Sequence, residues 1–198
     1  YHTFSGKVSG PVTELAAKLM QWAPTPALQN GRVVFANSGS ESNDTAFKLV
    51  RYYHNAIGKP DKKKVIARQR GYHGVTMAAA SLSGLPMMHQ QFDLPIAGVL
   101  RVSAPHHYAH ARPGEGEPAF VDRLVRELEE LIAREGADTI GGFIAEPVQG
   151  AGGVIIPPAG YFERVQAVLK KHQILFIADE VITGFGRLGQ RFGTQVFG

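Results

Sequence analysis

Two spacings of apolar residues alternate along the chain. Short runs of apolar, often β-branched residues predict buried strands, whereas apolar residues three and four positions apart predict helices with one buried face. The predicted strands are residues 33–36, 65–68, 96–102, 140–145 and 174–178. The predicted helices are residues 12–19, 46–58, 75–82, 120–136 and 162–171. Strands that alternate with helices indicate crossover connections, so we expect a three-layer α/β/α fold with a mostly parallel sheet.

The composition is that of a globular domain. Of the 198 residues, 44% are hydrophobic and 19% are charged, which suits a packed core and argues against disorder. The net charge of +4 comes from scattered Lys and Arg, apart from the cluster Lys62–Lys64. We expect that cluster to be a solvated turn, not a nucleic-acid contact. The lack of cysteine excludes disulfides and thiol nucleophiles and suits a reducing compartment.

The ends of the sequence suggest a piece of a longer protein. The chain opens at Tyr1 without an initiator Met and stops at Gly198 within a motif. No signal peptide is recognisable, and no apolar run is long enough to cross a bilayer. We therefore expect a cytoplasmic protein without a membrane partner.

The segment from Ala36 to Asn43 joins a predicted strand to a predicted helix. Ser38 followed by Glu41 fits a capping box. The N–H groups of Gly39 and Ser40 would then stay unpaired at the positive end of the helix dipole, and the Ser40 hydroxyl would add a donor. The segment predicts a phosphate site, although an ordinary capped helix has the same signature. The Walker A and dinucleotide-binding fingerprints are absent, which disfavours a nucleotide-binding domain.

Two further loops carry candidate chemistry. In Arg70–Gly74, the ring of Tyr72 between glycines could lie against a planar ligand, or it could pack on the core of a tight turn. In the loop after the strand 140–145, Glu146 ends the strand and Gln149 offers both a donor and an acceptor. A glutamate that only staples its loop is the alternative there.

The run from Ile174 to Arg187 gives the strongest signal. A buried strand ends at Asp179, at the strand end where open α/β sheets bind their ligands. A buried carboxylate needs a cationic partner or several hydrogen bonds, and a protonated pyridine ring would be such a partner. Val181 could pack against a ring face, and Arg187 is a candidate partner for an anion. Glu180 points away from Asp179 in extended geometry, so we expect structural contacts from it.

A metal site is not predicted. His106, His107 and His110 lie close together in sequence, but no acidic ligand accompanies them in the same segment.

Four segments together resemble the class III aminotransferases, pyridoxal-phosphate enzymes of fold type I. They are residues 38–43, 72–74, 146–150 and 179–187, and they follow the family order over essentially the entire chain. The resemblance implies that Gly39 and Ser40 hold the cofactor phosphate. It also implies that Tyr72 and Val181 cover opposite faces of the pyridine ring and that Asp179 bonds to the ring nitrogen.

Three more residues receive roles from the resemblance. Glu146 looks like the family's switch residue, which pairs with an arginine for some substrates. Gln149 is a neighbour of the ring, and His73 belongs to the cofactor motif without a proton-transfer role.

The sequence departs from the family pattern at two places. Position 182 is Ile, where members acting on ornithine or 4-aminobutyrate carry a Gln that bonds to the phenolic oxygen of the ring. The family's Schiff-base lysine lies well downstream of the aspartate, and no lysine occurs between Asp179 and Gly198. No catalytic residue is therefore assigned in this chain. We expect residues 1–198 to be a truncated large, cofactor-binding domain, inactive by itself.

The expected activity of the intact enzyme is transamination between an amine or ω-amino acid and a 2-oxo acid, in a homodimer. Related aminomutases and decarboxylases stay open as alternatives. A non-catalytic domain that binds a phosphate ligand or a partner is the alternative from a different functional class.

Overall fold

The computed structural model describes residues 8–198, which fall into two compact units divided after Ala36. In the first unit, α1 (Gly10–Trp22) begins after Ser9 with a proline in its first turn, and α2 (Pro26–Gln29) follows. The Thr25 side chain caps α2 by accepting a hydrogen bond from the Leu28 N–H at 3.3 Å. The predicted helix 12–19 is confirmed as part of α1.

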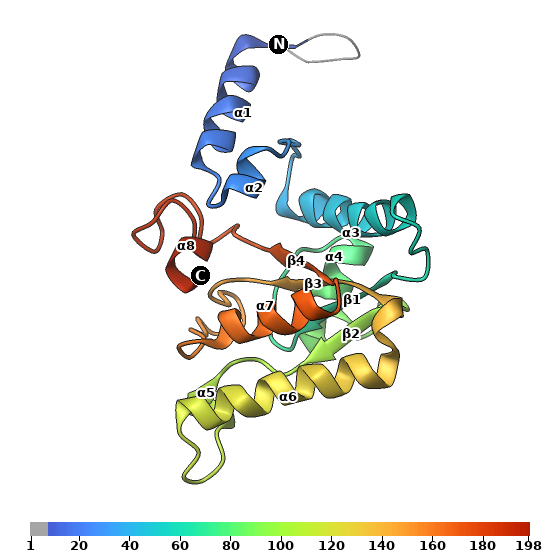
Figure 1. Cartoon of the computed structure of the whole chain (residues 1–198), viewed down its shortest axis with the longest axis vertical. Helices are drawn as coiled ribbons and strands as arrows, with labels where there is room; N and C mark the ends of the chain where they lie inside the picture. The colour runs from blue at the N-terminus through green and yellow to red at the C-terminus, as the bar shows by residue number, and fades with distance from the viewer. Residues whose placement is uncertain (1–7) are drawn as a thin grey trace. The chain divides into compact units, whose positions relative to one another are not determined.

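The second unit is built on a parallel sheet (Figure 1). The strands lie in the order β2-β1-β3-β4, and each neighbouring pair is parallel. Their bounds are β1 (Lys64–Arg68), β2 (Val99–Val102), β3 (Ile140–Ala145) and β4 (Leu175–Ala178). Every residue of β3 is buried, as expected of a central strand covered on both faces.

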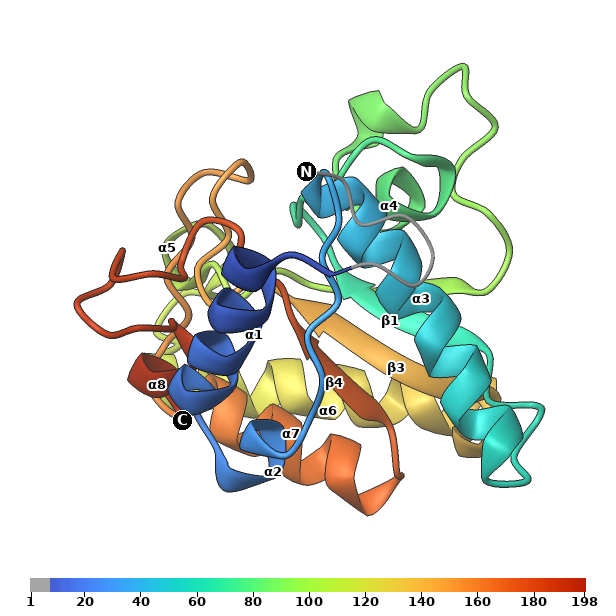
Figure 2. The same ribbon diagram turned by 90° about the horizontal axis from the view of Figure 1, so that it is seen from above.

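Helices cover both faces of this sheet, so the predicted three-layer α/β/α fold is confirmed (Figure 2). On one face, α6 (Glu117–Glu135) and α7 (Tyr161–Lys171) bury Phe120, Leu128 and Val165 against the sheet. On the other face, α3 (Gly39–Ala56) and α4 (Met77–Leu82) form a smaller core. Short helices complete the unit: η1 (Pro86–Met88), α5 (His107–His110), η2 (Ala137–Thr139) and α8 (Thr194–Phe197). Within residues 8–198, no helix has the length and apolarity needed to cross a membrane.

Two predictions from the sequence are wrong. Residues 33–36 form no strand, because their short apolar run has no partner strand in the described sheet. Lys62 is not a solvated turn residue, since it is only 2% exposed. Its Nζ donates to the carbonyl oxygens of Ala137, Ile140 and His172 at 2.8, 3.0 and 2.9 Å. A single ammonium group thus satisfies three carbonyl oxygens from two segments at the amino end of the sheet.

Candidate active site

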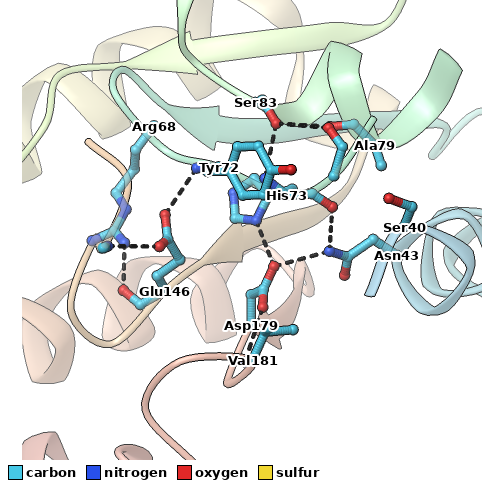
Figure 3. A network of polar contacts seen from close by, with 12 residues as sticks. Ser40, Asn43, Arg68, Tyr72, His73, Ala79, Ser83, Glu146, Asp179 and Val181 are labelled. Carbon is cyan, nitrogen blue, oxygen red and sulfur yellow. Dashed lines mark hydrogen bonds and ion pairs between the residues drawn. The ribbon is translucent and has the colours of Figure 1, made fainter. Parts of the chain in front are cut away.

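The carboxyl ends of β3 and β4 position Asp179 (Figure 3). Its N–H donates to the Ala145 carbonyl oxygen at 2.9 Å, which extends the β3–β4 pairing. Its Oδ2 accepts hydrogen bonds from His73 Nδ1 at 2.8 Å and Asn43 Nδ2 at 2.9 Å. Its Oδ1 accepts one from the Val181 N–H at 3.2 Å. Two distant segments and the N–H of its own loop therefore fix the orientation of this carboxylate.

The surroundings of Asp179 favour its ionised form. Burial alone would raise the pKa of this carboxyl, because a buried carboxylate loses its hydration. The hydrogen bond and the electrostatic attraction of His73, with the Asn43 amide and the Val181 N–H, outweigh that effect and hold the pKa below its ordinary value. Asp179 is thus a buried negative charge able to face a cationic group.

His73 lies behind this carboxylate. Its side chain is buried, its N–H donates to Ser83 Oγ at 2.8 Å, and its carbonyl oxygen accepts a hydrogen bond from Asn43 Nδ2 at 2.7 Å. Asn43 therefore holds the backbone of His73 and the carboxylate of Asp179 with one amide group.

The start of α3 has unused backbone donors. Ser38 Oγ accepts from the Glu41 N–H at 3.2 Å, and Glu41 Oε2 accepts from the Asn37 N–H at 2.6 Å. This is the predicted capping box, with the return bond made one residue before the N-cap. Within the described chain, the N–H groups of Gly39 and Ser40 make no hydrogen bond. Both are available to an anion at the helix start.

The Tyr-His-Gly turn packs tightly against this helix start. Ser40 Oγ accepts a hydrogen bond from the Val75 N–H at 3.0 Å, which leaves its own proton free to donate. Gly74 has a φ of +127°, and a Cβ there would lie 2.5 Å from Ser40 Oγ. Only glycine fits this close approach.

The start of α3, with the free N–H groups of Gly39 and Ser40, lies beside the Asp179 carboxylate. A Cβ on Gly39 would be 3.2 Å from Val181 Cγ2, and Asn43 links α3 directly to Asp179. Val181 is 74% exposed and Tyr72 is 38% exposed. In the view of Figure 3 they lie on opposite sides of the Asp179 carboxylate. The residues expected to hold a phosphate, a ring nitrogen and two ring faces are thus brought together.

Glu146 and Gln149 are more deeply placed. Glu146 Oε1 accepts from the Tyr72 N–H and Oε2 from the Gly150 N–H, each at 2.9 Å. The carboxylate thus connects two loops by hydrogen bonds. Its pairing with an arginine, which the resemblance implies, stays a prediction. Gln149 is fully buried, and its Nε2 donates to the Gln69 carbonyl oxygen at 2.9 Å. Its Oε1 has no partner within the described residues.

Sequence reasoning missed Asn43. A signal was present, because Asn43 continues the buried stripe of Phe47, Val50 and His54 on α3. A polar residue on a buried helix stripe needs a hydrogen-bond partner, and here that partner is the candidate site.

Other candidates have structural contacts. Glu180 accepts from Thr183 Oγ1 and from the N–H groups of Gly193 and Thr194, at 2.6, 2.7 and 2.8 Å, which confirms its predicted structural role. Among residues 8–198, no group of three or more His, Asp or Glu side chains could hold a metal ion.

Comparison with known proteins extends this picture. A family model described as aminotransferase class-III matches residues 1–198. A gamma-aminobutyrate transaminase 1 from Oryza sativa subsp. indica is 56% identical over 197 residues, and a vanillin aminotransferase from Capsicum frutescens is 54% identical. The alignments cover 100% of this chain but only 38% and 42% of those relatives.

A solved structure agrees with the fold. The omega transaminase from Pseudomonas jessenii in complex with PMP superposes with a TM-score of 0.95 at 56% identity. The match covers 100% of this chain and 43% of that one.

Proposed function

Because this chain belongs to the class III aminotransferase family, we propose that the full-length protein transfers an amino group from an amine or ω-amino acid to a 2-oxo acid with pyridoxal phosphate. The observation that carries the proposal is the buried, ionised Asp179 beside a helix start with free N–H groups. A carboxylate beside free N–H donors at a helix start suits a ligand that combines a basic heterocycle with a phosphate.

The residues present fit that cofactor. The N–H groups of Gly39 and Ser40, with the Ser40 hydroxyl, would bind the phosphate at the positive end of α3. Tyr72 and Val181 would contact the two faces of the ring, since both side chains are exposed at the site. When bound, pyridoxal phosphate supplies an electron-withdrawing heterocycle that carries the amino group between substrates.

Asp179 would hold a proton on the ring nitrogen. Its carboxylate is kept ionised by His73 and Asn43, so it attracts the protonated form of a facing heterocycle. His73 and Asn43 orient Asp179 and contact it on the side of Oδ2. Glu146, held by two backbone N–H groups, would border the substrate near Tyr72.

The substrate class rests on the relatives. Proteins named gamma-aminobutyrate transaminase and vanillin aminotransferase are 54–56% identical, which supports an amine or ω-amino acid as donor. We place the lysine for proton transfer in the full-length protein outside these residues, because none follows Asp179 here. We also propose that the full-length protein is a homodimer, as its family implies, and that the 198-residue chain alone is inactive.

Cofactor titration of the full-length protein tests the proposal. We expect pyridoxal phosphate to bind with a visible absorbance band and to support amino transfer from an amine to pyruvate or 2-oxoglutarate. D179A should weaken cofactor retention and abolish turnover. Binding of phosphate ligands without amino transfer would instead favour a non-catalytic domain, and full activity of D179A would contradict the role of Asp179.

A further inference from the structure

Arg68 is a buried cation next to the candidate site. It is the last residue of β1, and its side chain is only 1% exposed. Its guanidinium lies 5.5 Å from the centre of the Phe162 ring, and Nη2 donates to the backbone carbonyl oxygen of Glu146. Nε and Nη1 have no hydrogen-bond partner within the described residues.

Burial makes this arginine costly. The pKa of Arg68 is lowered by burial, and the Tyr161 hydroxyl and the Glu146 carboxylate oppose that shift. A buried ion is often no more stabilising than an apolar side chain of similar volume. A role in positioning the neighbouring loops would explain why a guanidinium is buried there.

The contact that Arg68 makes points to this role. Arg68 binds the main chain of Glu146, while the carboxylate of Glu146 accepts the N–H groups of Tyr72 and Gly150. Figure 3 shows Glu146 between Arg68 and Tyr72. At the start of α7, Tyr161 interacts electrostatically with the guanidinium, and the centre of the Phe162 ring lies 5.5 Å from it. The end of β1, the end of β3 and the start of α7 are thus joined at one buried group.

We propose that Arg68 is a positioning residue for the substrate side of the site. By fixing the backbone of Glu146, it keeps the Glu146 carboxylate on the N–H groups of Tyr72 and Gly150, and so fixes the Tyr72 loop. Its consequence for catalysis rests on the proposed function, but its consequence for the loops does not.

Amide hydrogen exchange of the cofactor-free full-length protein tests the structural part. R68K keeps the charge but replaces the planar, multiply donating group with a single ammonium. We expect the Tyr72 and Gly150 amides to exchange at least about 10-fold faster in R68K. The reason is that the weakened hydrogen bond to the Glu146 backbone lets the two loops open more often. The amide of Ile66 within β1 should keep its protection. R164K is the matched control, since Arg164 on α7 pairs with Asp122 at the surface.

Steady-state kinetics test the catalytic part. R68K should lower kcat/KM for the amino donor by about 10- to 100-fold, since a displacement near 1 Å at a site can cost that much. Cofactor affinity should fall less than kcat/KM, because only the Tyr72 ring contact depends on Arg68, whereas Asp179 is held by His73 and Asn43. E146Q should lower kcat/KM as well, and adding R68K to it should give less than the product of the two single effects, since both act through Glu146.

Each outcome decides the proposal. Unchanged exchange at Tyr72 and Gly150 in R68K would overturn it, and so would a loss of protection in Y161F that includes Ile66. Y161F, which removes only a hydroxyl, should give the same pattern more weakly, so a poorly folding R68K does not remove the test. A wild-type protein without amino transfer would contradict the proposed function. The hydrogen-exchange result would then still decide whether Arg68 fixes the Glu146 and Tyr72 loops.

Discussion

The imidazole of His73 donates its Nδ1 proton to Asp179 Oδ2 over 2.8 Å, and both side chains are almost completely buried. The two residues are 106 positions apart in the chain. Among residues 8–198, only the Val181 N–H donates to the second carboxylate oxygen, at 3.2 Å. His73 thus acts on one side of Asp179 and leaves the other available to a ligand.

Removing the imidazole should make cofactor binding sensitive to acid. In H73L, burial still raises the pKa of Asp179, but the strongest opposing contact is gone. We expect cofactor affinity to fall by at least about 10-fold near neutral pH and further as the pH is lowered, since one pKa unit corresponds to about 1.36 kcal/mol. Spectroscopic titration at several pH values measures this, with H110L as a control at an exposed histidine.

The same substitution should shift acid unfolding. A carboxyl whose pKa is lowered by folding contributes stability above its ordinary pKa and loses it as the pH falls through the lowered value. Wild-type, cofactor-free protein should therefore retain the Asp179 contribution to a lower pH than H73L does. Identical acid-unfolding midpoints for the two proteins would count against the His73–Asp179 contact.

Lys62 should be far more important for stability than its neighbour Lys63. K62M removes the donor that serves three carbonyl oxygens, and unsatisfied buried acceptors cost on the order of 1–3 kcal/mol. We expect the free energy of unfolding to drop by about 3 kcal/mol in K62M. K63M, at an exposed position, should change it by less than about 0.5 kcal/mol. Chemical denaturation compares the two variants. Equal losses of unfolding free energy would contradict the structural role of the Lys62 ammonium and its three carbonyl partners.

Gly74 should govern phosphate affinity. In G74A the new Cβ would meet Ser40 Oγ at 2.5 Å and Ser40 Cα at 2.9 Å, so the start of α3 must move. We expect cofactor affinity to fall by at least about 10-fold, the scale of one lost charge-assisted hydrogen bond. G58A has the same kind of backbone strain, at a φ of +75°, but its Cβ meets open space. It should lower stability without changing cofactor affinity, and equal affinity losses in both variants would contradict the role of Gly74.

Sequence patterns predict the layers of this fold well. The strands 65–68 and 140–145 are apolar runs buried on both faces, and the stripe of Phe120, Leu124 and Leu128 marks α6 without ambiguity. The patterns fail where burial depends on distant segments. The run 33–36 looks like a strand, but pairing requires a neighbour that its own sequence cannot specify. Lys62 looks solvated because its carbonyl partners lie 75 or more residues away.

The candidate site shows the same division. Gly39, Ser40 and Asp179 follow from local rules for helix starts and strand ends. Asn43 and Arg68 required the fold, because the first acts across 136 residues and the second across 78. A polar residue within an otherwise buried stripe or strand is the sequence signal common to both.

The most direct test of the central claim is the ¹⁵N chemical shift of the pyridine nitrogen in the full-length protein loaded with ¹⁵N-labelled pyridoxal phosphate. If Asp179 holds a proton on that nitrogen, the wild-type signal should be that of a protonated ring, and D179N should give that of a neutral ring. A neutral ring nitrogen in the wild type, or a protonated one in both proteins, would contradict the account.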